Sequence, residues 1–123
     1  MYTLDTNAII YYLKDDSDAV LILRDIFIKD IPIYISSLTE VELFAFPNLS
    51  SDEEEQIEEI LQTISIIPLD SRIARIAGFL RRTYRLKTGD SAIAATALFT
   101  RTTLITRNVK DFRKVNDLSI LHI

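Results

Sequence analysis

The sequence has no cysteine, one histidine and two glycines among its 123 residues. Without cysteine, disulfide bonds and thiolate ligands for a metal are excluded. A single histidine does not build a multi-histidine zinc site, and we expect His122 to be a strand-end packing residue. Because neither Gly78 nor Gly89 lies near the N-terminus, a phosphate-binding P-loop and a dinucleotide-binding fold are excluded as well.

Long hydrophobic runs are also absent. None approaches the ~18 residues that span a bilayer, and no basic segment followed by an apolar run opens the chain. These absences predict a soluble, cytoplasmic protein with no signal peptide and no membrane partner. Since 48% of the residues are hydrophobic, we expect a single domain, residues 1–123, with a substantial core.

The net charge of −4 conceals a contrast between the two halves of the chain. Residues 1–69 carry 3 basic and 14 acidic side chains, whereas residues 70–123 carry 11 basic and 4 acidic ones. Such a contrast indicates either an electrostatic partner such as a nucleic acid or helix faces that only keep the protein soluble.

Short β-type runs alternate with helical patterns along most of the chain. Strands are predicted at 2–4, 31–35, 65–69, 102–106 and 118–123. Helices are predicted between them, including 6–14 and 38–46, the second of which Pro47 ends. The alternation is typical of an α/β fold with a mostly parallel sheet covered on both faces.

Four acidic residues occupy special places in this pattern. Asp5 follows the first predicted strand, and Asp111 lies beyond the strand at 102–106. Glu42 and Asp90 lie near the starts of two helices. Because the carboxyl ends of parallel strands meet at one edge of a sheet, we expect all four to face one pocket.

Clustered carboxylates are costly to bury unless a cation accompanies them. Oxygen ligands suit Mg²⁺ or Mn²⁺, and such a site activates water for attack on a phosphodiester. Polar neighbours that could orient the carboxylates or bound water are Thr6, Asn7, Thr106 and Asn108. Taken singly, each acid also has a local explanation: a helix cap for Asp5 and Asp90, a surface position for Glu42, and a turn for Asp111.

Four segments carry a resemblance to PIN-domain ribonucleases, and more narrowly to the VapC-type toxins of toxin–antitoxin pairs. They are Leu4-Asp-Thr-Asn7, Ile35-Ser-Ser-Leu-Thr-Glu-Val-Glu-Leu43, Gly89-Asp-Ser-Ala-Ile-Ala-Ala-Thr-Ala97 and Leu104-Ile-Thr-Arg-Asn-Val-Lys-Asp-Phe112. They occur in the order of the family, and the resemblance covers nearly the whole chain. It implies a PIN-like three-layer α/β/α fold with a sheet of about five strands.

The resemblance also implies an activity: a Mg²⁺- or Mn²⁺-dependent endoribonuclease that hydrolyses RNA at a quartet of acids. Matching motif positions makes Asp5, Glu42 and Asp90 metal ligands and catalytic residues, with Glu40 a weaker match than Glu42. The fourth position falls on Asp111, with Asn108 as a polar helper. Some relatives carry an aspartate at the position of Asn108.

The partners that the resemblance implies are an RNA substrate, a second copy of the chain in a homodimer, and a small VapB-like antitoxin inserted into the active-site groove. The basic second half of the chain offers a path for RNA: Arg81, Arg82, Arg85, Lys87, Arg101, Arg107, Lys110, Arg113 and Lys114.

Two other functions fit parts of the sequence. A metal-dependent phosphatase of the haloacid-dehalogenase type also has an aspartate after its first strand, but it needs a second one where this chain has Asn7. A non-catalytic PIN-like module for RNA binding or dimerisation would need none of the acids. Cleavage of RNA by the pure protein separates these alternatives from a nuclease.

Overall fold

Strand β1 (Tyr2–Leu4) is the central strand of a five-stranded sheet with the order β3-β2-β1-β4-β5. The computed structural model describes residues 1–123, the whole chain. The other strands are β2 (Ile33–Ser36), β3 (Ser65–Ile67), β4 (Thr103–Thr106) and β5 (Ile120–His122). Each neighbouring pair runs parallel. All five strands therefore end at the same edge, as the sequence predicted for a mostly parallel sheet.

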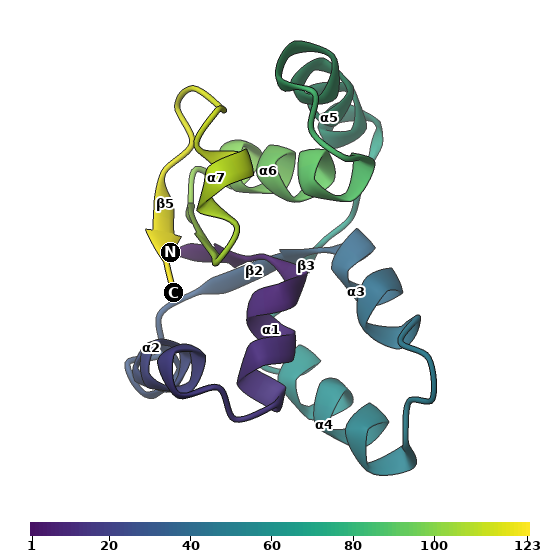
Figure 1. Cartoon of the computed structure of the whole chain (residues 1–123), viewed down its shortest axis with the longest axis vertical. Coiled ribbons are helices and arrows are strands. Elements are labelled where there is room, and N and C mark those ends of the chain that lie inside the picture. Colours follow the sequence, from purple (N-terminus) through teal and green to yellow (C-terminus); the bar gives the residue numbers. More distant parts are fainter.

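Seven helices surround the sheet. They are α1 (Thr6–Leu13), α2 (Ser17–Ile28), α3 (Ser37–Phe44), α4 (Ser51–Leu61), α5 (Ser71–Tyr84), α6 (Thr88–Thr100) and α7 (Val109–Phe112). Helices α1, α2 and α4 lie on one side of the sheet, and α5, α6 and α7 lie on the other (Figure 1). This confirms the predicted three-layer α/β/α fold. No helix is long and apolar enough to span a membrane.

Two hydrophobic cores, one on each face, hold the layers together. The first joins residues of α1, α2 and α4 to the sheet, including Ile9, Leu23 and Ile57. The second joins α5, α6 and α7, including Ile73 and Phe112. Helix α6 is rich in alanine and every residue from Ser91 to Ala97 is buried, so its backbone lies close to the sheet.

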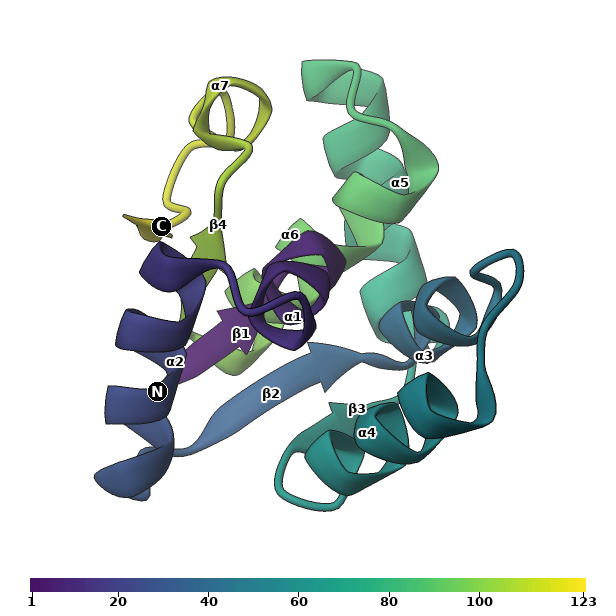
Figure 2. The same cartoon turned by 60° about the horizontal axis from the view of Figure 1, so that its bottom comes forward.

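The order of the strands places a reversal at β1. Strands β2 and β3 follow one another on one side of β1, whereas β4 and β5 lie on its other side. In open α/β sheets, the crevice that binds ligands lies at the strand ends next to such a reversal. Figure 2 shows β1 and β2 running side by side with α1 leaving the end of β1. The site expected at Asp5 is therefore at the reversal itself.

Several predicted boundaries and one predicted role are wrong. Helix α1 ends at Leu13, one residue before the end of the predicted helix at 6–14, and Asp5 stands in its N-cap position. Helix α3 ends at Phe44, before Phe46 and Pro47, and β2 begins only after Pro32, which has no N–H for the ladder. His122 is exposed in β5, so it is not a packing residue.

Candidate active site

Asp5 occupies the end of the central strand. Its side chain is 4% exposed and makes no capping bond to α1, although Asp5 stands at the N-cap position. Instead its Oδ2 accepts a hydrogen bond of 2.7 Å from the hydroxyl of Thr106, the last residue of β4. The local explanation of Asp5 as a helix cap therefore fails, because the carboxylate turns across the strand ends.

The surroundings of Asp5 disfavour its charged form. Burial raises the pKa of Asp5 from 3.8 to about 6; the Thr106 hydrogen bond opposes the rise, and the charges of Asp90 and Glu42 add to it. None of the ion pairs of the chain involves these three acids. A buried carboxylate that lacks a cationic side chain is a costly feature, and such features gather at functional sites.

Glu42 reaches the same region from helix α3. Its Oε1 accepts a hydrogen bond of 2.7 Å from the hydroxyl of Thr6, which is also 3.1 Å from the hydroxyl of Thr39. A β-carbon at Gly89 would lie 3.2 Å from Oε2 of Glu42, so only glycine leaves ordinary space there for the carboxylate. No hydrogen bond of the chain involves the side chain of Glu40, whereas Glu42 accepts the one from Thr6.

Asp90 lies in the first turn of α6, next to Gly89. It is not the helix cap, because the N-cap residue of α6 is Lys87. Burial raises the pKa of Asp90, the charge of Asp111 raises it further, Lys87 lowers it, and Glu42 raises it. Electrostatic coupling thus connects Asp90 to both Glu42 and Asp111. Asp90 also acts on Asp5, so it links acids that lie up to 106 positions apart in the sequence.

Asp111 lies in the short helix α7, on the far side of β4. Its Oδ2 accepts a hydrogen bond of 3.0 Å from the side-chain amide of Asn108, and Lys114 Nζ lies 3.9 Å from Oδ1. The backbone N–H of Asn108 donates to the hydroxyl of Thr106, 3.0 Å away. Thr106 therefore connects Asp5 to the loop that carries Asp111, and Asn108 contacts both Thr106 and Asp111.

An open cleft of about 370 Å³ lies between these elements. It is lined by Asp5, Thr6, Asn7, Glu42 and Asp90, together with Ile10, Ala45, Phe46 and Pro47. Asp111 stays outside this lining, and in their present positions no three acidic or histidine side chains form a group that could hold an ion. The assignment of metal ligands stays a prediction. It calls for water-mediated contacts or small side-chain shifts, and Mg²⁺ commonly keeps several waters.

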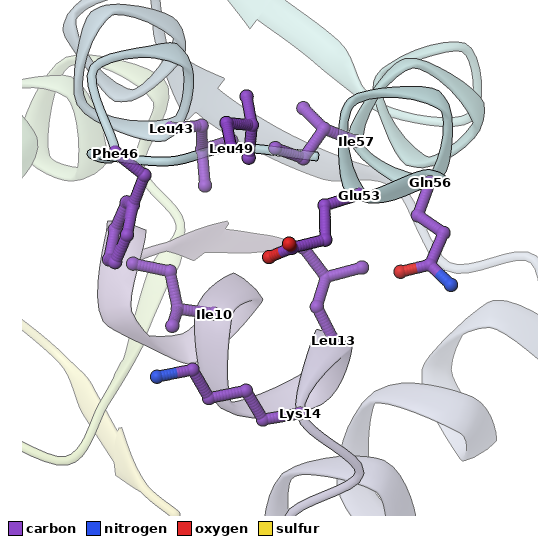
Figure 3. Close-up of a pocket in the computed structure, with 9 residues that line it drawn as sticks. All are labelled: Ile10, Leu13, Lys14, Leu43, Phe46, Leu49, Glu53, Gln56 and Ile57. Atoms are coloured by element: carbon purple, nitrogen blue, oxygen red, sulfur yellow. The ribbon is translucent and has the colours of Figure 1, made fainter. Parts of the chain in front are cut away.

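An apolar groove adjoins the acidic cleft and shares Ile10 and Phe46 with it. Side chains from α1, from the end of α3 and the segment after it, and from α4 converge on this groove (Figure 3). Its remaining lining consists of Leu13, Lys14, Leu43, Leu49, Glu53, Gln56 and Ile57. Sequence patterns assigned these residues to separate elements and did not bring them together.

Arg107 was expected on an RNA path, and the structure gives it a different place. Its guanidinium donates to both carboxylate oxygens of Asp16, at 2.6 and 3.3 Å, and lies 4.1 Å from the ring centroid of Tyr11. Its Nε donates to the carbonyl of Ile123 at 3.2 Å. Arg107 therefore joins the α1–α2 junction to the C-terminus. No local sequence signal reveals this contact, because Asp16 lies 91 positions away.

The fold and the site define a class: parallel α/β proteins with coupled carboxylates where the strand order reverses. The family model described as PIN domain matches residues 2–118. This chain belongs to the PIN domain family.

Proteins of known name and structure resemble the chain over nearly its whole length. It is 27% identical to Ribonuclease VapC2 of Rickettsia felis, with 96% of this chain and 94% of that protein covered. It is 29% identical to Ribonuclease VapC19 of Mycobacterium tuberculosis, with 96% and 97% covered. A chain of a toxin–antitoxin complex from Klebsiella pneumoniae superposes with a TM-score of 0.81 at 29% identity, with both chains fully covered.

Proposed function

We propose that this protein is a metal-dependent endoribonuclease of the VapC type, which hydrolyses RNA phosphodiester bonds and is neutralised by a cognate antitoxin. The observation that carries the proposal is the buried Asp5, coupled to Asp90 and Glu42 without a cationic partner. The relatives named ribonuclease support the choice of RNA.

The donor set fits a hard divalent cation. The acids that face the cleft offer only oxygen atoms, which Mg²⁺ and Mn²⁺ prefer. Asp5, Glu42 and Asp90 are the side chains that would hold the ion, and Asp111, outside the cleft lining, acts on the charge of Asp90. When bound, such an ion compensates the carboxylate charges and lowers the pKa of a water for attack on phosphorus.

The chain itself supplies the orientation of these groups. Thr106 fixes one oxygen of Asp5, and Thr6 fixes one oxygen of Glu42, and both acidic residues line the cleft. Asn108 donates to one oxygen of Asp111, and Lys114 lies near the other. Oriented carboxylates of this kind lose little freedom when they engage a ligand, which favours catalysis.

Cleavage of RNA by the purified protein tests the proposal. We expect cleavage with Mg²⁺ or Mn²⁺, none with a chelator, and loss of cleavage in Glu42→Gln. The matched control is Glu40→Gln, two positions away on the same helix and outside the cleft lining. Cleavage that survives Glu42→Gln together with Asp90→Asn would contradict the assignment. RNA binding with no cleavage would indicate the non-catalytic module, and release of phosphate from small esters alone would indicate the phosphatase.

An antitoxin and a homodimer complete the proposal. The similarity to a chain of a toxin–antitoxin complex supports an antitoxin, and the apolar groove beside the cleft offers it a surface. We expect Leu49→Glu to abolish co-purification with the product of a neighbouring short reading frame while RNA cleavage persists. Light scattering of the pure protein tests the homodimer, and a monomer mass at micromolar concentration would contradict it. Because RNA is the substrate, we infer a cytoplasmic location.

A further inference from the structure

Helix α5 carries an arginine-lined hollow that the acidic site does not use. We propose that this hollow binds phosphate groups of the RNA backbone, as a second binding surface outside the cleft; the proposal rests on the ribonuclease function proposed above. The lining consists of Gly78, Arg81, Arg82, Arg85 and Leu86, around an open space of about 490 Å³.

The arrangement of α5 leaves this face open. The helix buries Ile73, Ala77 and Leu80, and it packs against α6 at the periphery of the molecule (Figure 1). Gly78 lies on another side and is exposed. Residues three and four positions further along a helix share its face, which places Arg81 and Arg82 beside Gly78. Arg85, the left-handed C-cap residue after the helix, completes the lining.

The positive charges of the hollow have no acidic partners. None of the ion pairs of the chain includes Arg81, Arg82 or Arg85. The Nη1 of Arg81 donates to the carbonyl of Leu86 at 2.9 Å, and the guanidinium of Arg82 lies 5.8 Å from the ring centroid of Phe79. These interactions hold the side chains and leave the charge uncompensated. Guanidinium groups bind phosphate oxygens in pairs, so three of them suit a polyanion.

Gly78 indicates that another molecule approaches the helix closely. Glycine in the middle of a helix is less stable than alanine. A β-carbon at Gly78 would meet nothing within 4 Å, so packing inside the chain does not explain this glycine. Because Gly78 has no side chain, a ligand can reach the helix backbone between the arginines.

The position of the hollow favours the substrate as its ligand. Arg85 precedes Asp90 by five residues, a separation of at most about 18 Å even for extended chain. Lys87 lies between them and acts on the charge of Asp90. One RNA strand can therefore reach the hollow and the cleft together. An acidic face of a second copy, such as the acids of 52–59 on α4, is the competing occupant.

Binding of a labelled single-stranded RNA to the Asp5→Asn protein, with chelator present, tests the hollow apart from cleavage. We expect Arg82→Gln/Arg85→Gln to weaken binding about tenfold or more at low salt. The slope of log affinity against log salt should become shallower by about 0.7 for each phosphate that the variant no longer neutralises. The control is Arg75→Gln, on the same helix but outside the hollow, which should leave affinity within about twofold.

The variant Gly78→Ala separates ligand binding from a structural role. We expect it to raise the melting temperature, because alanine favours helix, and yet to weaken RNA binding severalfold. Unchanged RNA affinity in both Gly78→Ala and the double arginine variant overturns the proposal. The proposal is also overturned if Arg82→Gln/Arg85→Gln keeps its RNA affinity but loses self-association in sedimentation, because the hollow would then bind a second copy of the chain. RNA that binds through the arginines but is never cleaved would refute the nuclease function and leave the hollow intact.

Discussion

Asp5 and Asp16 stand at the same local position, the N-cap of a helix, and the structure uses them in opposite ways. Asp16 accepts a hydrogen bond from the backbone N–H of Ala19 and pairs with Arg107. The Arg107 hydrogen bonds hold the pKa of Asp16 below its usual value. Asp5 caps nothing, has no cationic partner, and has its pKa raised to about 6 by burial.

The contrast separates a carboxylate whose charge stabilises the fold from one whose charge the fold disfavours. Charge on Asp16 is favourable in the folded state, because the guanidinium and the helix N-terminus both compensate it. Charge on Asp5 is unfavourable in the folded state, because burial and the nearby charges of Asp90 and Glu42 oppose it. The pKa of an aspartate at the N-cap position of a helix therefore depends on its tertiary contacts and not on its local position.

The largest expected difference between the two aspartates is in cleavage of RNA. We expect Asp5→Asn to lower kcat/KM by more than about 100-fold, since even groups that only orient a metal ligand cost 10–100-fold when removed. We expect the kcat/KM of Asp16→Asn to stay within about fivefold of the wild-type value. Initial rates on one RNA, at matched folded concentrations, measure both. Equal losses in the two variants would remove the distinction.

The effects on the free energy of unfolding should have the opposite order: Asp5→Asn should stabilise the protein and Asp16→Asn should destabilise it. A shift of pKa from 3.8 to about 6 corresponds to roughly 3 kcal/mol against the charged folded state, so Asp5→Asn should gain about 1–3 kcal/mol at pH 7.5. Asp16→Asn should lose stability at that pH. Urea unfolding in the presence of chelator measures both changes.

The pH dependence gives the control for this stability change. Because the folded pKa of Asp5 is raised, wild-type stability falls as pH rises from about 3.8 to about 6. The gain in Asp5→Asn should therefore vanish near pH 3.5. The Asp16 contribution has the opposite sign: it is present above pH 3.8 and is lost as pH falls through the lowered value. A gain in Asp5→Asn that is independent of pH would point to packing instead of charge.

Gly89→Ala should have a smaller effect on the site. The new β-carbon would lie 3.2 Å from Oε2 of Glu42, so the carboxylate must move by a few tenths of an ångström. We expect a loss of roughly tenfold in kcat, of the order found when an orienting group is disturbed. Because the effect acts through Glu42, Gly89→Ala/Glu42→Gln should be no worse than Glu42→Gln alone. Additive losses would show that Gly89 acts elsewhere.

The sequence predicted most of the fold because the alternation of strands and helices is strong in this chain. Asp5, Glu42 and Asp90 were expected near one edge for the same reason, and Thr6 and Thr106 do bond to the acids beside them. Asp111 was harder to place, since the short helix α7 keeps it outside the cleft lining.

The interactions that sequence reasoning missed depend on long-range packing. The pairing of Arg107 with Asp16 joins segments 91 positions apart, and nothing in either segment signals the other. The closeness of Gly89 to Glu42 likewise follows only from the way α6 meets α3. Charge counts alone placed Arg107 among RNA-binding residues, because they do not reveal which charges are already paired.

Titration of Mn²⁺ into wild type and Asp5→Asn by calorimetry tests the central claim most directly. At pH 6, where Asp5 is about half protonated, we expect wild type to bind the ion and release protons to the buffer, while Asp5→Asn binds far more weakly. Equal binding by the two proteins, or RNA cleavage that persists in chelator, would contradict a divalent-cation site built on Asp5.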